Sequence, residues 1–139
     1  MARPMRPLIE MLVVPSDGSV VTSVVAEVGA TYRLVASGVF KWGGCEITAC
    51  PGGAACNFDR VGDAYHRSDD CWSSTTTGYE YVSLYLDDEQ IDWGEYRTDH
   101  VYTVERVGAG AGLQFRIGDC TTCFGDNSGQ LQVHIYLVP

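Results

Sequence analysis

The sequence predicts an all-β protein, a jelly-roll-type sandwich of about eight strands, and three observations favour this fold class. Short apolar or alternating segments recur along the chain, turn-forming residues separate them, and no stretch sustains the 3.6-residue period of a helix. At 139 residues the chain has the length of one domain with its own core. Strands of this number and spacing are typical of a sandwich, and a jelly roll is its natural form at this length.

The first part of the chain holds three of the expected strands. Residues 8–14 form an apolar run that ends at the turn Pro15-Ser-Asp-Gly18. Segments 20–28 and 32–40 are rich in valine and partly alternate between apolar and polar residues. Gly29-Ala30 separates them, and we expect a hairpin at this point.

The middle of the chain is irregular, and the second half returns to strands. Residues 43–60 are rich in Gly, Pro and Cys and are expected to form a loop, within a Cys-rich insertion at about 43–72 of a single domain, 1–139. Turns are expected at Asp87-Asp88-Glu89 and at Gly108 to Gly112. The further expected strands are 79–86, 101–107, 113–117 and 131–138.

The charge balance argues against one class of partner, nucleic acid. Nine basic residues face 18 acidic ones, and the formal net charge is −9. Nucleic-acid binding depends on Lys and Arg to neutralise phosphates, so no nucleic-acid partner is expected. No apolar run approaches the length that crosses a membrane, so no membrane insertion is expected. An acidic surface suits solubility and cation binding.

The cysteines indicate disulfides and an oxidising compartment. Their number is even, and four lie in the irregular middle segment. We expect a local Cys120–Cys123 bridge, with the other four paired among themselves in an order that the spacing leaves open. Zinc binding, for which C-x-x-C has ligand spacing, and free thiols are the alternatives. The cysteines favour an extracellular or cell-surface location, whereas Met1 to Leu8, which lacks the apolar core of a signal peptide, neither supports nor excludes it. The six are Cys45, Cys50, Cys56, Cys71, Cys120 and Cys123.

The segment Asp119 to Gly129, just before the last expected strand, carries the clearest chemical pattern. Asp119, Asp126 and Asn127 put three oxygen-bearing side chains in one loop. Calcium takes several oxygen ligands at once, so the loop predicts a calcium site. The alternative is a tight turn, because Asp-Asn-Ser-Gly also satisfies local backbone groups.

Three segments resemble the calcium-dependent galactose-binding bacterial lectins, the LecA-like β-sandwich family. Tyr32 to Gly43 is similar to the family's second-strand motif, which ends in an aromatic residue and Gly. Gly62-Asp-Ala-Tyr-His66 is similar to its short acidic segment. Asp119 to Ile135 is similar to its calcium loop and last strand. The resemblance runs from about Ser19 onward and implies a galactose-binding-domain-like jelly roll.

The resemblance also implies a ligand set. The ion would be held by the carbonyls of Trp42 and Cys123 and by the side chains of Asp119, Asp126 and Asn127. The sugar would then coordinate calcium through two vicinal hydroxyls. The implied sugar-binding residues are His66, Asp119, Asp126 and Asn127.

This chain departs from the family pattern at named positions. Cys123 stands where the lectins have Thr, which matters little if only the carbonyl is used. Asp126 replaces Asn, which adds charge for calcium but removes an amide donor to the sugar. Arg67 follows His66 where the lectins have Pro. Without the resemblance, His66 is an ordinary loop residue.

Two functions from different classes follow, and neither is an enzyme, because no Ser or Cys nucleophile with its base is recognisable. The first is a calcium-dependent carbohydrate-binding module that gains avidity as a homo-oligomer or repeated assembly. The alternative is a structural subunit of an extracellular assembly, such as an adhesin, fibre or surface layer, in which calcium and disulfides only stabilise the fold. There the run Leu8 to Val14 would supply a strand to a neighbour, although it is more simply the first strand of its own sheet.

Overall fold

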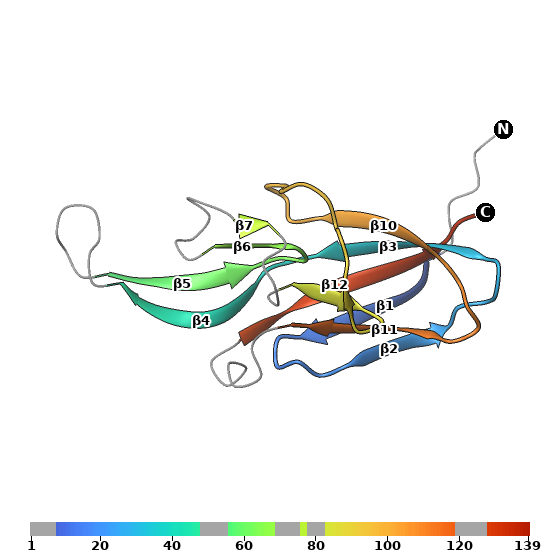
Figure 1. Cartoon of the computed structure of the whole chain (residues 1–139), viewed down its shortest axis with the longest axis horizontal. Helices are drawn as coiled ribbons and strands as arrows, with labels where there is room; N and C mark the ends of the chain where they lie inside the picture. The colour runs from blue at the N-terminus through green and yellow to red at the C-terminus, as the bar shows by residue number, and fades with distance from the viewer. Residues whose placement is uncertain (1–7, 48–55, 69–75, 78–82, 119–127) are drawn as a thin grey trace.

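The computed structural model describes residues 8–47, 56–68, 76–77, 83–118 and 128–139. Within these ranges, only the backbone is described for residues 41–47, 56–61, 67–68 and 76–77. All regular structure in the described ranges is β, and every strand pair is antiparallel (Figure 1). The all-β fold class is therefore confirmed. In the same ranges, no helix is long and apolar enough to span a membrane.

The strands fall into a large and a small sheet. The large sheet has the order β10-β3-β12-β4-β5-β6-β7, with β1 added alongside β12, and the small sheet has the order β2-β11-β8-β9. The described strands are β1 (Leu8–Pro15), β2 (Val21–Val25), β3 (Thr31–Ser37), β4 (Phe40–Ile47), β5 (Cys56–Gly62), β6 (His66–Ser68), β7 (Thr76–Thr77), β8 (Leu84–Leu86), β9 (Glu89–Gln90), β10 (Tyr102–Val107), β11 (Gly112–Ile117) and β12 (Ser128–Leu137).

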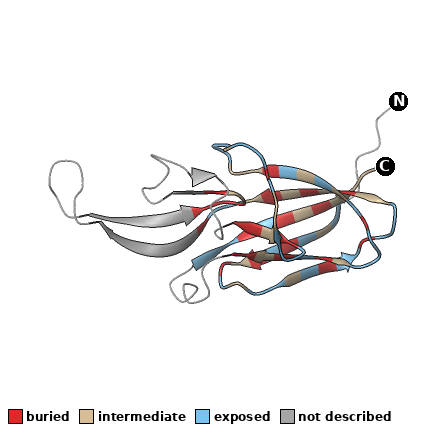
Figure 2. Ribbon diagram, viewed as in Figure 1, coloured by how far each residue is buried: buried red, intermediate tan, exposed pale blue. Residues whose placement is uncertain are grey.

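The core lies where β10, β3, β12 and β1 face the small sheet (Figure 2). Alternate residues of β3 are buried, which are Tyr32, Leu34 and Ala36, and β11 buries Phe115 and Ile117 from the other layer. Side chains alternate across a strand, so this period-2 burial is what a half-buried strand produces. The apolar residues that alternate in the sequence are therefore those on the inner face of each sheet.

The strands β3 and β4 act as one long strand beside β12. The register that pairs Ser37 with Gln132 continues without a shift to the pair of Phe40 with Gly129. Beyond this point β4 pairs with β5, and the two extend away from the sandwich (Figure 1). The predicted loop over 43–60 is therefore wrong at both ends, because strand pairing outweighs the low β-propensity of a Gly-rich sequence.

The predicted hairpin at Gly29-Ala30 is also wrong. β2 pairs with β11 in the small sheet, whereas β3 pairs with β10 and β12 in the large one, so this connection crosses between layers. This connection lies against the one between β10 and β11, which also crosses between the sheets. The Gly108 N–H donates to the Ala30 carbonyl at 2.7 Å, and the Gly29 N–H donates to the Gly108 carbonyl at 3.2 Å. Hydrophobic periodicity predicts a strand but does not predict the strand with which it pairs.

Other sequence predictions agree with the structure. The run 8–14 is the first strand of its own sheet, since β1 pairs with β12 from Leu8 to Pro15. The strands predicted at 101–107, 113–117 and 131–138 correspond to β10, β11 and β12. Of the strand predicted at 79–86, the described residues include β8.

Candidate functional site

Three parts of the chain that are far apart in the sequence meet at Phe40 of β4. This residue pairs with Gly62 of β5 on one side and with Gly129 of β12 on the other. A Cβ atom added at Gly62 would lie 3.0 Å from Phe40 Cζ, and one added at Gly129 would lie 3.3 Å from Phe40 Cα. Gly129 also has a φ of +88°, which L side chains rarely adopt. The two glycines therefore allow the strands to close around a ring that is 1% exposed.

The backbone at Trp42 lies beside the start of β12. Lys41 pairs with Ser128, the first residue after 119–127, and also with Val61. The β4–β5 register shifts between Lys41 and Gly43, so Trp42 is the extra residue of a β-bulge. A bulge leaves a residue out of the ladder and redirects its groups. Trp42, whose carbonyl was predicted to bind the ion, therefore directly follows Lys41, the residue that pairs with Ser128.

The other predicted calcium ligands, Asp119, Cys123, Asp126 and Asn127, lie outside the described residues. In the part of the chain that the structure describes, no three His, Cys, Asp or Glu side chains gather closely enough to hold a metal ion. The disulfide predictions also concern side chains outside the described set. Those cysteines are Cys45, Cys50, Cys56, Cys71, Cys120 and Cys123.

His66, the predicted sugar contact, is fully buried. Its Nε2 lies 2.8 Å from the Gly94 carbonyl, which can only accept, so Nε2 carries a proton. The ring meets Tyr65 and Tyr96 edge-on and stacks on Tyr102. A sugar would reach this ring only after the segment at Gly94 moved away. The sugar contact stays a prediction, and the observed contacts hold two segments together.

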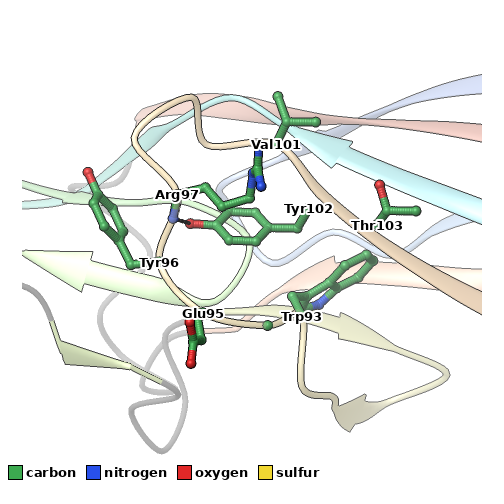
Figure 3. A pocket seen from close by; sticks show the side chains of 8 residues that line it. Trp93, Glu95, Tyr96, Arg97, Val101, Tyr102 and Thr103 are labelled. Atoms are coloured by element: carbon green, nitrogen blue, oxygen red, sulfur yellow. Dashed lines mark hydrogen bonds between the residues drawn. The ribbon is translucent and has the colours of Figure 1, made fainter.

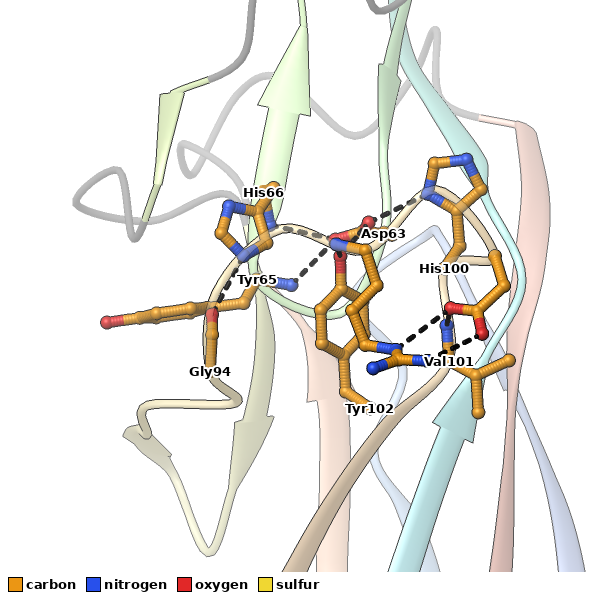
Figure 4. A network of polar contacts seen from close by, with 9 residues as sticks. Asp63, Tyr65, His66, Gly94, His100, Val101 and Tyr102 are labelled. Atoms are coloured by element: carbon orange, nitrogen blue, oxygen red, sulfur yellow. Dashed lines mark hydrogen bonds and ion pairs between the residues drawn. The ribbon is translucent and has the colours of Figure 1, made fainter.

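Asp63 is the centre of a buried polar network (Figure 4). Its side chain is 0% exposed. Oδ1 accepts the backbone N–H groups of Tyr65 at 3.0 Å and His66 at 2.8 Å. Oδ2 accepts the Tyr102 hydroxyl at 2.6 Å and lies 2.9 Å from His100 Nδ1. Four hydrogen bonds compensate the loss of water around this carboxyl group.

The network continues into the loop before β10. The Tyr102 hydroxyl accepts the Arg97 backbone N–H at 3.1 Å. Burial, and then the bond to Asp63, raise the pKa of Tyr102 well above its usual range, so the hydroxyl stays a donor. His100 has a φ of +56°, and its N–H donates to the Arg97 carbonyl at 3.0 Å. The backbone of this loop is thus fastened to Asp63 through Tyr102.

Sequence reasoning did not find this network. Asp63 belongs to the Gly62–His66 segment, where the sequence indicates an acidic residue but not its partners. In the sequence, His100 belongs to no recognisable motif, and Tyr102 lies in the expected strand 101–107. Residues 37 and 39 positions apart in the chain meet here, and no local pattern signals such a contact.

A pocket of about 650 Å³ lies between residues 93–97 and the start of β10 (Figure 3). The Trp93 ring is 3% exposed, and its Nε1 donates to the Leu84 carbonyl at 2.9 Å. Tyr102 lies in the middle of the close-up, with its hydroxyl directed at the Arg97 backbone nitrogen. The lining residues are Trp93, Gly94, Glu95, Tyr96, Arg97, Val101, Tyr102 and Thr103.

The described residues define an all-β protein in which two antiparallel layers enclose one core, with a loop-lined pocket beside the edge strand β10. No family model matches the chain, and no curated protein matches its sequence.

Proposed function

We propose that the protein is a calcium-dependent carbohydrate-binding module of the galactose-binding-domain-like jelly-roll type, similar to the bacterial LecA-like lectins. The observation that supports this most directly is the meeting of three distant segments at Phe40. Each segment resembles a part of the lectin site, and Phe40 pairs with one residue from each of the other two, Gly62 and Gly129. These pairs support the proposal, because segments that build one site must lie close together in the fold.

The donor set fits a hard cation. The side chains of Asp119, Asp126 and Asn127 and the carbonyls of Trp42 and Cys123 would hold calcium through oxygen alone, as this ion prefers. When bound, the ion supplies coordination to two vicinal hydroxyls of the sugar. The bulge at Trp42 supports its part in the set, because a residue outside the ladder has a backbone group to offer.

The proposal describes binding without catalysis. An extracellular bacterial setting would suit the six cysteines and their predicted disulfides. The net charge of −9 favours cations over nucleic acid. A single shallow site of this kind binds weakly, so useful avidity would come from several copies of the module.

Calorimetry tests the proposal. Calcium titrated into chelator-stripped protein should bind saturably at about one ion per chain, and galactose should then release further heat. Asp119→Ala should lose both signals. Asp17→Ala is a matched control, since Asp17 is a turn aspartate whose Oδ1 accepts the Ser19 N–H in an exposed position. Galactose binding that persists in Asp119→Ala would contradict the proposal.

A second candidate is a structural subunit of an extracellular assembly, and one observation favours it. Eight of the ten large hydrophobic side chains that are exposed among the described residues lie between residues 8 and 28. They belong to β1, β2 and the adjoining turns, and both strands are edge strands of their sheets. The eight are Leu8, Ile9, Met11, Val13, Val20, Val24, Val25 and Val28.

Sedimentation velocity over a range of protein concentrations tests this candidate. Met11→Lys should reduce self-association if the β1 edge is an interface. Val107→Lys is the control, because Val107 is 63% exposed on β10, the opposite edge of the large sheet. Deletion of β1 would be uninformative, since it removes a strand that β12 needs. Equal association of the two lysine variants and the parent would exclude this interface.

A further inference from the structure

The pocket beside β10 has a fixed wall. Residues 93–97 are held at three points: Trp93 Nε1 donates to Leu84, His66 Nε2 donates to the Gly94 carbonyl, and the Arg97 N–H donates to Tyr102. The side chains that make two of these bonds, Trp93 and His66, are at least 97% buried. A wall anchored from behind needs little ordering when a ligand binds, and this lowers the cost of binding.

The lining combines apolar surface with hydrogen-bond donors and acceptors. Val101 and the half-buried ring of Tyr96 contribute apolar area, and Thr103 offers a hydroxyl. The buried Trp93 and Tyr102 back the pocket from the core. Glu95 contributes an acceptor and Arg97 contributes donors. A volume of about 650 Å³ is far larger than an ion needs and lies in the range of small-molecule sites.

The charges in the pocket argue against an anionic ligand. The Arg97 guanidinium is paired with Asp99, with Nε to Oδ1 at 3.1 Å and Nη2 to Oδ2 at 3.0 Å. Hydrogen bonding to Asp99 raises the pKa of Arg97, and the same contact lowers that of Asp99. Among the described lining residues, Arg97 carries the only positive charge, which Asp99 matches, and Glu95 adds a negative one. A phosphate or carboxylate would meet net repulsion here.

We propose that this pocket is a second carbohydrate subsite, which takes a neutral saccharide without calcium. A sugar ring has an apolar C–H face for Tyr96 and Val101, and its hydroxyls both donate and accept, which Glu95, Arg97 and Thr103 complement. The inference rests on the proposed function, because it assumes that the protein binds glycans. Its wall is held by His66, four residues after the Gly62 that pairs with Phe40, so one framework supports both sites.

Amide chemical shifts in ¹⁵N-labelled protein test the subsite. The probes are galactose, lactose and maltose, each titrated with EDTA present so that the calcium site is empty. At least one saccharide should shift the amides of Arg97, Val101 and Thr103 saturably. Thr103→Lys, which fills the pocket from an exposed strand position, should weaken this binding at least tenfold. Glu105→Ala is the matched control, because Glu105 is on the same strand, outside the pocket, and pairs with Arg33.

The outcomes separate the subsite from the calcium site. Saturable shifts in EDTA that persist in Asp119→Ala support the subsite, even if calcium and galactose fail to bind together. Absence of pocket shifts with every probe overturns it, even if calcium-dependent galactose binding is found. Shifts that require calcium, that glycerol reproduces, or that remain unchanged in Thr103→Lys also overturn it.

Discussion

The Tyr102 hydroxyl donates a 2.6 Å hydrogen bond to Oδ2 of Asp63, and the two residues are 39 positions apart in the sequence. Both are buried, with exposed fractions of 1% and 0%. The bond joins the start of β10 to the connection between β5 and β6. Through the backbone of Arg97 it also fixes the wall of the pocket. A buried, charge-assisted bond of this kind is expected to contribute to stability and to position the loop.

Removal of the Asp63 carboxyl group should therefore be costly. Asp63→Ala leaves the Tyr102 hydroxyl, the His100 ring and two backbone N–H groups without their shared acceptor. We expect the free energy of unfolding to fall by about 3–5 kcal/mol. Asp63→Asn keeps one acceptor oxygen and should cost less than Asp63→Ala. Urea unfolding followed by tryptophan fluorescence measures both, and an alanine variant within about 1 kcal/mol of the parent would contradict this role.

Tyr102 should make stability fall at high pH. Its folded-state pKa is raised, mainly by burial, so its contribution is complete below the unfolded pKa of about 10. As pH rises above that value the unfolded chain ionises first, and the contribution declines until the folded pKa is passed.

Comparison with Tyr102→Phe isolates this effect. The phenylalanine variant should be less stable than the parent at pH 8, because a bond to a carboxylate is lost. At pH 11 the difference should shrink by about 1.4 kcal/mol, the value of one pKa unit. Urea unfolding at the two pH values measures it. A difference that is independent of pH would show that the hydroxyl titrates normally in the folded protein.

Alanine substitution at the two glycines around Phe40 should reduce stability at both positions but calcium affinity at only one. Gly129→Ala places a side chain at a φ of +88° and 3.3 Å from Phe40 Cα, whereas Gly62→Ala meets only the far end of the ring, at 3.0 Å. We expect losses of about 1–3 kcal/mol in stability for each. Calorimetric calcium affinity should weaken only in Gly129→Ala, which changes the entry to β12 after the predicted loop. Equal affinities in the two variants would argue against a calcium site at this junction.

Glu10 should protect an exposed sheet edge. Its Oε2 accepts the Val24 N–H at 2.8 Å, so one side chain joins the edge strands β1 and β2. Glu10 is also the only charged residue of β1. Glu10→Ala should increase aggregation, because charges on an edge strand oppose strand addition. Light scattering during storage measures this, and Arg33→Ala, on the inner strand β3, is the control. Unchanged scattering in Glu10→Ala would contradict a protective role.

Much of the strand inventory could be predicted because burial imposes a local period. Tyr32, Leu34 and Ala36 alternate with polar neighbours since one face of β3 meets the core. The same reasoning located β1, β10, β11 and β12 to within three residues. It failed at residues 43–47 and 56–60, where Gly and Cys suggested a loop although β4 and β5 pair there.

By itself the sequence determined the all-β class, the acidic character and the loop composition that suggests calcium. These depend on residue type and on spacing of a few positions, which physical chemistry links directly to local structure. Tertiary structure alone decided that the chain crosses between sheets at Gly29, that Phe40 joins Gly62 to Gly129, and that Asp63 bonds Tyr102 and His100. Such contacts arise from register between distant strands, and register depends on the whole packed core rather than on any one segment.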